Sequence, residues 1–383
     1  MENANESEVS IGSRQEAAIV SLNNALAYLK VKAKTNSCMI VGPLHRFKIT
    51  LTDPSSLQKI DNAKTRASLT LVMKASSPPI VTPNFSDGTI SLDLMFGPHP
   101  VVKFADHIGS LELAKKEMAL PIILGATNVN DPLIRDLAKM PHLLIAGTTG
   151  SGKTMQLHSI IASLMVIPDV KLALLDPKMV EFNRYDSAAQ LAYDVSNTLE
   201  DCVRVVSDLE SRMRARLEKI AKAGCKDIQD YRSNGHKMSY LVLVIDELAD
   251  LVRSKKSNFS KILCSLAEKS RAVGIHIVGA TQQPSADVIT GPIKANFPSR
   301  IACKVATRVH SDVILGAGGA DGLTGQGDAL LIDGELSLVR FRGALVELSV
   351  KPTVDKGSAT KVQPGLFGRI LGAVMTSQAK KKD

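Results

Sequence analysis

The stretch LLIAGTTGSGKT, residues 143–154, places a glycine-rich turn between an apolar run and a helical pattern. Its spacing, Gly147-x-x-x-x-Gly152-Lys153-Thr154, is that of a P-loop, in which glycines let the backbone fold closely around phosphate. Exposed backbone N–H groups and the N-terminus of the following helix supply positive potential. The sequence therefore predicts a nucleoside triphosphate site built from Gly147, Thr148, Thr149, Gly150, Ser151, Gly152, Lys153 and Thr154.

Four side chains are expected to carry the chemistry of this site. Lys153 should reach the β- and γ-phosphates of the nucleotide, and the Thr154 hydroxyl should bind Mg²⁺. The apolar run YLVLVIDELADL ends in Asp246 and Glu247. Asp246 is expected beside Mg²⁺, and Glu247 is expected to orient or deprotonate the attacking water. A carboxylate in this second place favours hydrolysis over nucleotide binding alone.

Two further strand ends carry polar residues. IHIVGATQQ ends in Thr281 and Gln282, either of which could sense the γ-phosphate or position water. An ordinary turn at the end of a strand explains these two residues equally well. LLDPK, residues 174–178, is another strand whose polar end is expected to line the site.

The alternation of apolar runs and helical patterns around the P-loop indicates the fold. From about residue 129, helical patterns alternate with the apolar runs HLLIAG, VKLALLD, YLVLVID, IHIVGATQ and RIACKVAT. Continuous apolar strands are typical of a parallel sheet with helices on both faces. We therefore expect an α/β P-loop domain over residues 129–348. It should include a long amphipathic helix over residues 199–222, whose arginines form either a solvated face or a DNA-facing ridge.

The flanking segments have different patterns. Residues 1–15 are expected to be disordered, and residues 16–128 to form a small α+β domain. That domain should begin with a helix over residues 15–30 and continue with strands in CMIVG, HRFKITL, SLTLVMKA and TISLDLMF. Residues 349–383 are expected to be a tail with a short helix in GLFGRILGAVM. The tail is interpreted as a frayed terminus or as a contact for membrane, DNA or a protein partner.

Composition restricts the partners and the setting. A net charge of +9 suits a polyanion such as nucleic acid, although a soluble protein with a lysine-rich tail explains it as well. Aromatic residues are only 4% of the chain, which favours duplex DNA over stacked single strands. The five cysteines are scattered, which predicts neither disulfides nor a zinc site. With no apolar run of roughly 18–20 residues and no signal peptide pattern, a cytoplasmic protein without a membrane span is expected.

Several longer segments resemble the motor part of the FtsK/SpoIIIE/Tra family of double-stranded DNA translocases. The matching segments, within residues 37–347, are DLAKMPHLLIAGTTGSGKT, LLDPKMVEF, VIDELADL, AEKSRAVGIHIVGATQ and PSADVITGPIKANFPSRIACKV. The resemblance implies a RecA-like P-loop domain preceded by the family's small domain. It further implies a homohexameric ring, with duplex DNA in the pore and ATP between neighbouring subunits.

The resemblance also assigns roles to individual residues. Arg271, in KSRAVGIH, matches an arginine finger that would reach the ATP of the adjacent subunit. Gln282 matches the polar sensor of the family. Contacts to DNA are expected from Arg308, Lys304 and Arg300, although Lys304 and Arg300 fit a structural role equally well.

Two departures from the family pattern leave a second hypothesis open. Gln283 stands where the family has an arginine, and Asp312 stands where a second basic residue is expected to meet DNA. A carboxylate repels phosphates, so the grip on DNA could be weaker. The alternative to a DNA translocase is a DNA-independent ATPase, such as a coupling or assembly protein of a mobile-element transfer system.

Overall fold

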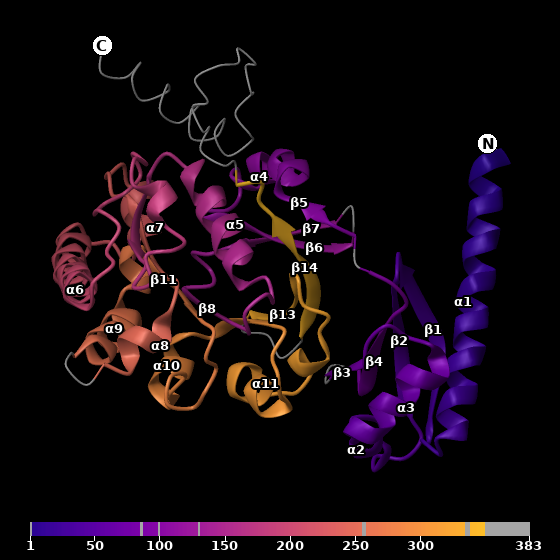
Figure 1. Ribbon diagram of the computed structural model, residues 1–383. Helices are drawn as coiled ribbons and strands as arrows, with labels where there is room; N and C mark the ends of the chain where they lie inside the picture. Colours follow the sequence, from indigo (N-terminus) through magenta and orange to yellow (C-terminus); the bar gives the residue numbers. More distant parts are fainter. Residues whose placement is uncertain are drawn as a thin grey trace, which may run out of the picture.

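A computed structural model of the chain describes residues 2–84, 87–98, 100–128, 131–254, 258–333 and 338–348. The described residues form two hydrophobic cores. One lies under a small N-terminal sheet, and the other surrounds a large sheet that contains the P-loop strand (Figure 1). We call residues 2–96 the small domain and residues 101–348 the P-loop domain.

The small domain is a four-stranded antiparallel sheet covered by helices. Its strand order is β1-β2-β4-β3, and α1 packs along β1 and α3 (Figure 1). The fully buried Leu26, Phe47, Leu69 and Leu92 form the centre of its core. The elements are α1 (Glu2–Tyr28), β1 (Ala33–Val41), β2 (Leu44–Leu51), α2 (Ser56–Ile60), α3 (Ala63–Met73), β3 (Ile80–Asn84) and β4 (Thr89–Met95).

Two sequence predictions for this domain were wrong in part. SLTLVMKA, predicted as a strand, lies largely in α3, because the Asn62 side chain caps that helix and Lys74 ends it in the left-handed conformation at φ 54°. Its buried Leu69 and Met73 are four residues apart, which is a helical spacing. Helix α1 begins at Glu2, within the stretch predicted to be disordered. That stretch has no proline and contains glutamate, alanine and glutamine, which are good helix formers.

The large sheet has a parallel part and an antiparallel part. Its strand order is β7-β6-β14-β13-β12-β8-β11-β10-β9, with β5 paired to β14. Neighbours are parallel from β12 to β9 and antiparallel from β12 to β7. The strands are β5 (Val102–Lys103), β6 (Pro121–Asn128), β7 (Asp131–Asp136), β8 (His142–Ala146), β9 (Val170–Leu175), β10 (Tyr240–Ile245), β11 (Ile275–Thr281), β12 (Ser299–Cys303), β13 (Asp328–Asp333) and β14 (Val339–Leu345).

Helices flank this sheet (Figure 1). Helix α5 packs on β6 and β14, and α6 packs on α9. The α-helices are α4 (Ile108–Ala114), α5 (Lys153–Met165), α6 (Leu199–Lys222), α7 (Ile228–Ser233), α8 (Leu248–Val252), α9 (Phe259–Lys269), α10 (Gly291–Asn296) and α11 (Arg308–Leu315). The 3-10 helices are η1 (Phe104–His107), η2 (Asn183–Tyr185), η3 (Arg271–Val273) and η4 (Ala320–Gly322).

The predicted α/β fold is confirmed, and so are its five apolar strands, which are β8 to β12. The long helix predicted over residues 199–222 is α6, and it buries Cys202, Val206, Leu209, Met213 and Ile220. The sequence did not reveal that the sheet continues with antiparallel strands. Short apolar runs of this kind look alike in parallel and antiparallel strands.

The domain boundary predicted at residues 128/129 falls inside the β6–β7 hairpin. Strand β6 pairs with both β7 and β14, so it belongs to the large sheet. Leu111 and Ile122 are fully buried in the larger core. The boundary between the two domains therefore lies before β5. The sequence there contains only a run of turn-forming residues, which does not distinguish a domain boundary from an ordinary loop. The short helix predicted in residues 349–383 lies outside the described residues.

Ion pairs connect the two domains. Arg66 of the small domain is 5% exposed, and its Nη1 lies 3.2 Å from Asp321 Oδ2. Arg340, on β14, has Nη2 2.8 Å from Asp328 Oδ2 and Nη1 3.9 Å from Asp93 Oδ2 of the small domain. The Arg66–Asp321 pair thus joins α3 to η4, and the Arg340–Asp93 pair joins β4 of the small sheet to β14, which lines the P-loop cavity.

Candidate nucleotide site

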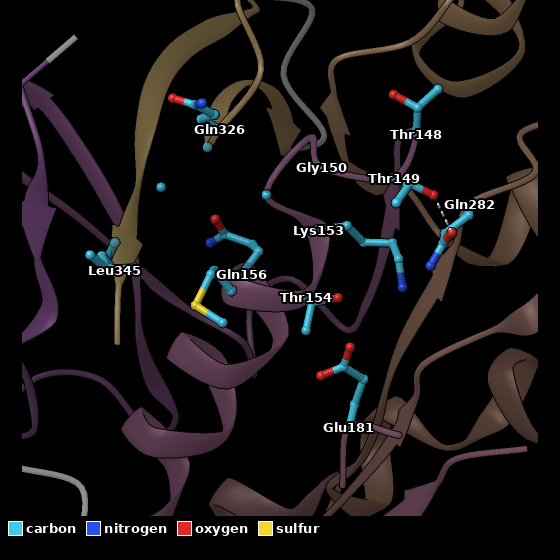
Figure 2. Close-up of a pocket in the computed structure, with 15 residues that line it drawn as sticks. Thr148, Thr149, Gly150, Lys153, Thr154, Gln156, Glu181, Gln282, Gln326 and Leu345 are labelled. Atoms are coloured by element: carbon cyan, nitrogen blue, oxygen red, sulfur yellow. Dashed lines mark hydrogen bonds between the residues drawn. The ribbon is translucent and has the colours of Figure 1, made fainter. Parts of the chain in front are cut away.

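A cavity of about 460 Å³ lies at the P-loop, between β8 and α5 on one side and β14 on the other (Figure 2). It has the size of a typical site for a small ligand. Six of the eight predicted P-loop residues line it: Thr148, Thr149, Gly150, Gly152, Lys153 and Thr154. The other two are packed beneath the loop. A Cβ atom on Gly147 would lie 2.6 Å from the Cβ of Cys303, and Ser151 is only 1% exposed.

Backbone contacts hold the P-loop in its curve. Gly152 has φ +107°, and a Cβ atom there would lie 2.5 Å from the Gly327 nitrogen, so glycine is required. The Gly327 N–H donates to the Ser151 carbonyl at 2.8 Å, and the Thr148 N–H donates to the Lys304 carbonyl at 2.9 Å. The turns that follow β12 and precede β13 thus fix the loop from outside.

Lys153 and Asp246, predicted separately from two motifs, form a buried ion pair. The Nζ atom of Lys153 lies 2.9 Å from Asp246 Oδ1 and donates to the Asp246 carbonyl at 2.9 Å. Both side chains are 3% exposed. Parallel strands explain the meeting, because β8 and β10 end at the same edge of the sheet. Lys153 must exchange part of this pairing for phosphate when a nucleotide enters.

The groups around this pair suit Mg²⁺. The Thr154 hydroxyl faces the cavity (Figure 2). Asp246 does not line the cavity, but its carboxylate is paired with Lys153, which does. Both are hard oxygen donors of the kind that Mg²⁺ prefers. Within the described residues, no cluster of three or more His, Cys, Asp and Glu forms a metal site of its own.

Glu247 lies in a closed network behind the cavity. It is fully buried, and it accepts hydrogen bonds from Thr281 Oγ1 at 2.7 Å, Lys178 Nζ at 3.0 Å and the Gln282 N–H at 3.2 Å. Burial raises the pKa of Glu247, but these hydrogen bonds lower it more, so the pKa lies below its ordinary value. Glu247 is not among the described residues that line the cavity. It stays ionised and joins β9, β10 and β11 at their ends.

Gln282 reaches the cavity, whereas Thr281 does not. The Gln282 Oε1 accepts from Thr149 Oγ1 at 2.9 Å, so the side chain lies over the P-loop (Figure 2). Thr281 is fully buried and its hydroxyl donates to Glu247. Of the two residues left open by the sequence, Gln282 has the position from which a γ-phosphate could be sensed.

Several residues that line the cavity were not singled out from the sequence. They are Met155, Gln156, Glu181, Gln326, Gly327, Gly343, Ala344 and Leu345. Gln326 lies in the turn before β13 and Leu345 ends β14, and Figure 2 shows them across the cavity from Lys153 and Gln282. Among them, Glu181 could have been suspected from the sequence, because it lies shortly after the segment 174–178, whose polar end was expected to line the site.

Arg271 lies at the opposite edge of the sheet. It begins η3, just before β11, whereas the P-loop follows the other end of the parallel strand β8. Its side chain lines a second cavity of about 740 Å³ together with Lys139, Lys269 and His276. Arg271 therefore cannot reach the nucleotide cavity of its own subunit.

The three predicted DNA-binding residues lie in different surroundings. Arg300 is half-buried and its Nη1 donates to the Ile314 carbonyl at 3.0 Å, which is a structural contact. Lys304 is exposed beside the P-loop. Arg308 begins α11 and has Nη2 2.7 Å from Asp61 Oδ2 of the small domain.

The two residues that depart from the family pattern contact arginines. Gln283 accepts a hydrogen bond from Arg253, which also pairs with Asp287 at 2.7 Å. Arg253 thus places a guanidinium next to the position where the pattern has one. Asp312 lies 4.0 Å from Arg308, one helical turn along α11. It therefore offsets part of the charge of Arg308.

The fold and the cavity define a P-loop α/β protein. The model of the FtsK/SpoIIIE family matches residues 105–286. The chain is 34% identical to the DNA translocase FtsK of Chlamydia trachomatis over 87% of this chain and 43% of that protein. It is 32% identical to the DNA translocase FtsK of Haemophilus influenzae over 94% of this chain and 74% of that protein. The chain belongs to the FtsK/SpoIIIE family.

Solved structures show the same fold. The pCW3 conjugation coupling protein TcpA, solved with ATPγS, superposes with a TM-score of 0.61 at 24% identity, covering 85% of this chain and 94% of that one. The cytoplasmic domain of the type VII secretion ATPase EccC of Thermomonospora curvata gives a TM-score of 0.56 at 23% identity, covering 67% and 31%. At this identity the likeness concerns the fold alone.

None of the described helices is both long and apolar enough to cross a membrane.

Proposed function

We propose that the chain binds ATP and Mg²⁺ in the P-loop cavity and uses hydrolysis to move double-stranded DNA. The observation that carries this proposal is the convergence of Lys153, Thr154, Asp246 and Gln282 at the edge where the parallel strands end. Membership of the FtsK/SpoIIIE family supports DNA as the substrate. The chain spans only 43% of the length of its Chlamydia trachomatis relative, so the work on DNA is part of the proposal.

We assign a role to each of these residues. Lys153 leaves Asp246 to bind the β- and γ-phosphates, and the P-loop N–H groups bind the remaining phosphate oxygens. Thr154 and Asp246 would hold Mg²⁺, which would supply positive charge to the phosphates. Gln282 senses the γ-phosphate across Thr149. Glu247 orients or deprotonates the attacking water once its network with Lys178 and Thr281 opens.

The position of Arg271 supports assembly into a ring. Because it lies at the edge of the sheet opposite the P-loop, it would serve the nucleotide of a neighbouring copy, where its charge stabilises the transferred phosphate. Head-to-tail contacts of this kind close into a ring when the rotation allows it. We propose a homohexamer with duplex DNA in its pore.

The first test is ATP hydrolysis with and without long duplex DNA. Stimulation by duplex and not by single strands, lost in Lys153→Ala, is the expected result. Lys171→Ala is the matched control, because Lys171 lies on β9 and donates to the Ala189 carbonyl at 3.0 Å, away from the cavity. Hydrolysis that is equal with and without duplex would rule out a DNA-driven motor.

A DNA-independent ATPase or coupling protein is the second candidate. Asp312 and Asp61, which both pair with Arg308, are the observations that favour it, since they offset the charge expected to meet DNA. Salt separates the two: binding through phosphates weakens steeply as salt rises, whereas docking through apolar surface does not.

A further inference from the structure

Glu181 is a second carboxylate at the nucleotide cavity, and its backbone is held firmly. It follows β9 in the segment 176–182. Asp176 Oδ2 accepts hydrogen bonds from the N–H groups of Glu181 at 2.8 Å and Phe182 at 2.9 Å. The side chain lines the cavity, and Figure 2 shows its carboxylate pointing toward Thr154. The loop therefore presents a carboxylate to the end of the cavity where phosphate is expected.

A buried histidine supports this carboxylate from behind. His158 lies on α5, one turn after Thr154, and is fully buried. Its Nε2 lies 3.4 Å from Glu181 Oε2, and its Nδ1 lies 2.7 Å from the Tyr185 hydroxyl. The Nε2–Oε2 contact is long and is not a well-formed hydrogen bond. This contact lowers the pKa of Glu181 more than burial raises it, and the carboxylate is ionised.

An ionised carboxylate in a triphosphate cavity needs a cation. Without one it would repel the phosphates that the P-loop is built to bind. Lys153 and Arg184 act on Glu181 only from a distance, and the Nζ of Lys153 is paired directly with Asp246. Mg²⁺ bound to phosphates keeps several of its waters, and carboxylates hold those waters by accepting hydrogen bonds. Glu247 does not offer this contact, because it is enclosed by Thr281, Lys178 and Gln282.

We propose that Glu181 binds the water shell of nucleotide-bound Mg²⁺, as a third protein group beside Thr154 and Asp246. Glu181 thereby makes nucleotide binding depend on the cation: it favours the Mg²⁺ complex and opposes the free triphosphate. His158 is the positioning residue that keeps the carboxylate turned into the cavity. This inference rests on the proposed ATP and Mg²⁺ site.

The test measures binding of ATPγS by calorimetry, once with Mg²⁺ and once with EDTA. Glu181→Gln should weaken binding about tenfold with Mg²⁺, as loss of an outer-shell metal contact does. With EDTA it should bind as tightly as the wild type or more tightly, because a repulsive charge is gone. Asp186→Asn is the matched control: it removes the same charge from an exposed residue that directly follows η2.

The outcomes distinguish this inference from the proposed function. No binding of ATPγS to the wild type under either condition would overturn the proposed function itself. Wild-type binding with no effect of Glu181→Gln, or an equal loss with Mg²⁺ and with EDTA, would overturn only the role of Glu181. Glu181→Asp keeps the charge on a shorter side chain, and we expect it to retain part of the Mg²⁺ dependence. Identical behaviour of the Asp and Gln variants would contradict a role for the charge.

Discussion

Arg308 of the P-loop domain and Asp61 of the small domain form an ion pair, with Nη2 2.7 Å from Oδ2. Arg308 Nη1 also donates to the Asp61 carbonyl at 3.3 Å. The guanidinium is 48% exposed, so the pair lies at the surface where the domains meet. The arginine expected to meet a DNA phosphate is thus occupied by a carboxylate of the same chain.

Removing this carboxylate should strengthen DNA binding. Asp61→Asn frees Arg308, and we expect duplex affinity to rise about two- to fivefold, the value of an exposed ion pair. The gain should shrink as salt rises, because phosphate contacts are screened. Fluorescence anisotropy of a labelled duplex at two salt concentrations measures both. Asp53→Asn is the control, since Asp53 pairs with Lys32 in the same domain. Equal gains in the two variants would show an effect of net charge alone.

Arg271 should act between subunits. Arg271→Ala is expected to bind ATPγS normally, because Arg271 does not line the nucleotide cavity, and to lose most hydrolysis. Mixing it with wild type at fixed total protein should reduce activity more than dilution does, since each variant subunit disables a neighbour. Lys139→Ala, which alters the same second cavity, is the control. Activity that falls in simple proportion to the wild-type fraction would contradict a contribution in trans.

The parts of the site that could be predicted are those that one segment encodes. The P-loop is recognised from the spacing between Gly147 and Thr154 alone, and Asp246 from its place at the end of an apolar strand. The contact between Lys153 of the P-loop and Asp246 follows because the parallel strands that precede them end at the same edge of the sheet. Gln326, in the turn before β13, and Leu345, on β14, could not be predicted, because the antiparallel strands that bring them to the cavity look like parallel ones in the sequence.

Long-range partners explain most of the other differences. Arg308 and Asp61 are 247 positions apart, so no local pattern shows their contact. Nothing in the sequence distinguishes Arg300 from a DNA-binding arginine, yet in the structure it donates a hydrogen bond to the Ile314 carbonyl. The boundary at residue 128 was misplaced because β6 pairs with β14 from the far end of the chain. Short sequence patterns predicted most helices and strands correctly. The exception is the apolar run predicted as a strand that lies in the helix capped by Asn62.

Gly125 should be intolerant of a side chain. It has φ +152°, and a Cβ atom there would lie 1.9 Å from the Arg342 carbonyl oxygen and 2.9 Å from the Gly343 Cα. Backbone atoms cannot move aside cheaply, so Gly125→Ala should lower the free energy of unfolding by about 3 kcal/mol. Gly224→Ala is the control, with φ +69° and nothing within 4 Å, and should cost about 1 kcal/mol. Urea unfolding measures both, and equal losses would show that the β6–β14 contact is not tight.

Two buried histidines should make the P-loop domain sensitive to acid. Burial lowers the pKa of His142 to about 3 and that of His276 to about 4. His142 accepts from the Ile277 N–H at Nδ1, 3.1 Å away, and its Nε2 lies 2.9 Å from the Ala267 carbonyl, so the neutral ring is satisfied. His276 has its Nδ1 3.1 Å from the Pro141 carbonyl.

The sign of the effect follows from these depressed values. A histidine in the unfolded chain has a pKa near 6.5. Below that pH these two histidines are protonated in the unfolded chain but stay neutral in the folded chain. Stability is therefore full above pH 6.5 and falls as the pH drops toward 4, by about 2 kcal/mol for each histidine between pH 6.5 and 5. The amide oxygen of asparagine can still accept from the Ile277 N–H and does not titrate, so His142→Asn should flatten the dependence measured by urea unfolding at pH 7 and 5, while loss of the contact to the Ala267 carbonyl lowers stability equally at both pH values. The exposed His236, changed to Asn, should leave it unchanged. An equally steep loss in His142→Asn would show that other groups cause the acid sensitivity.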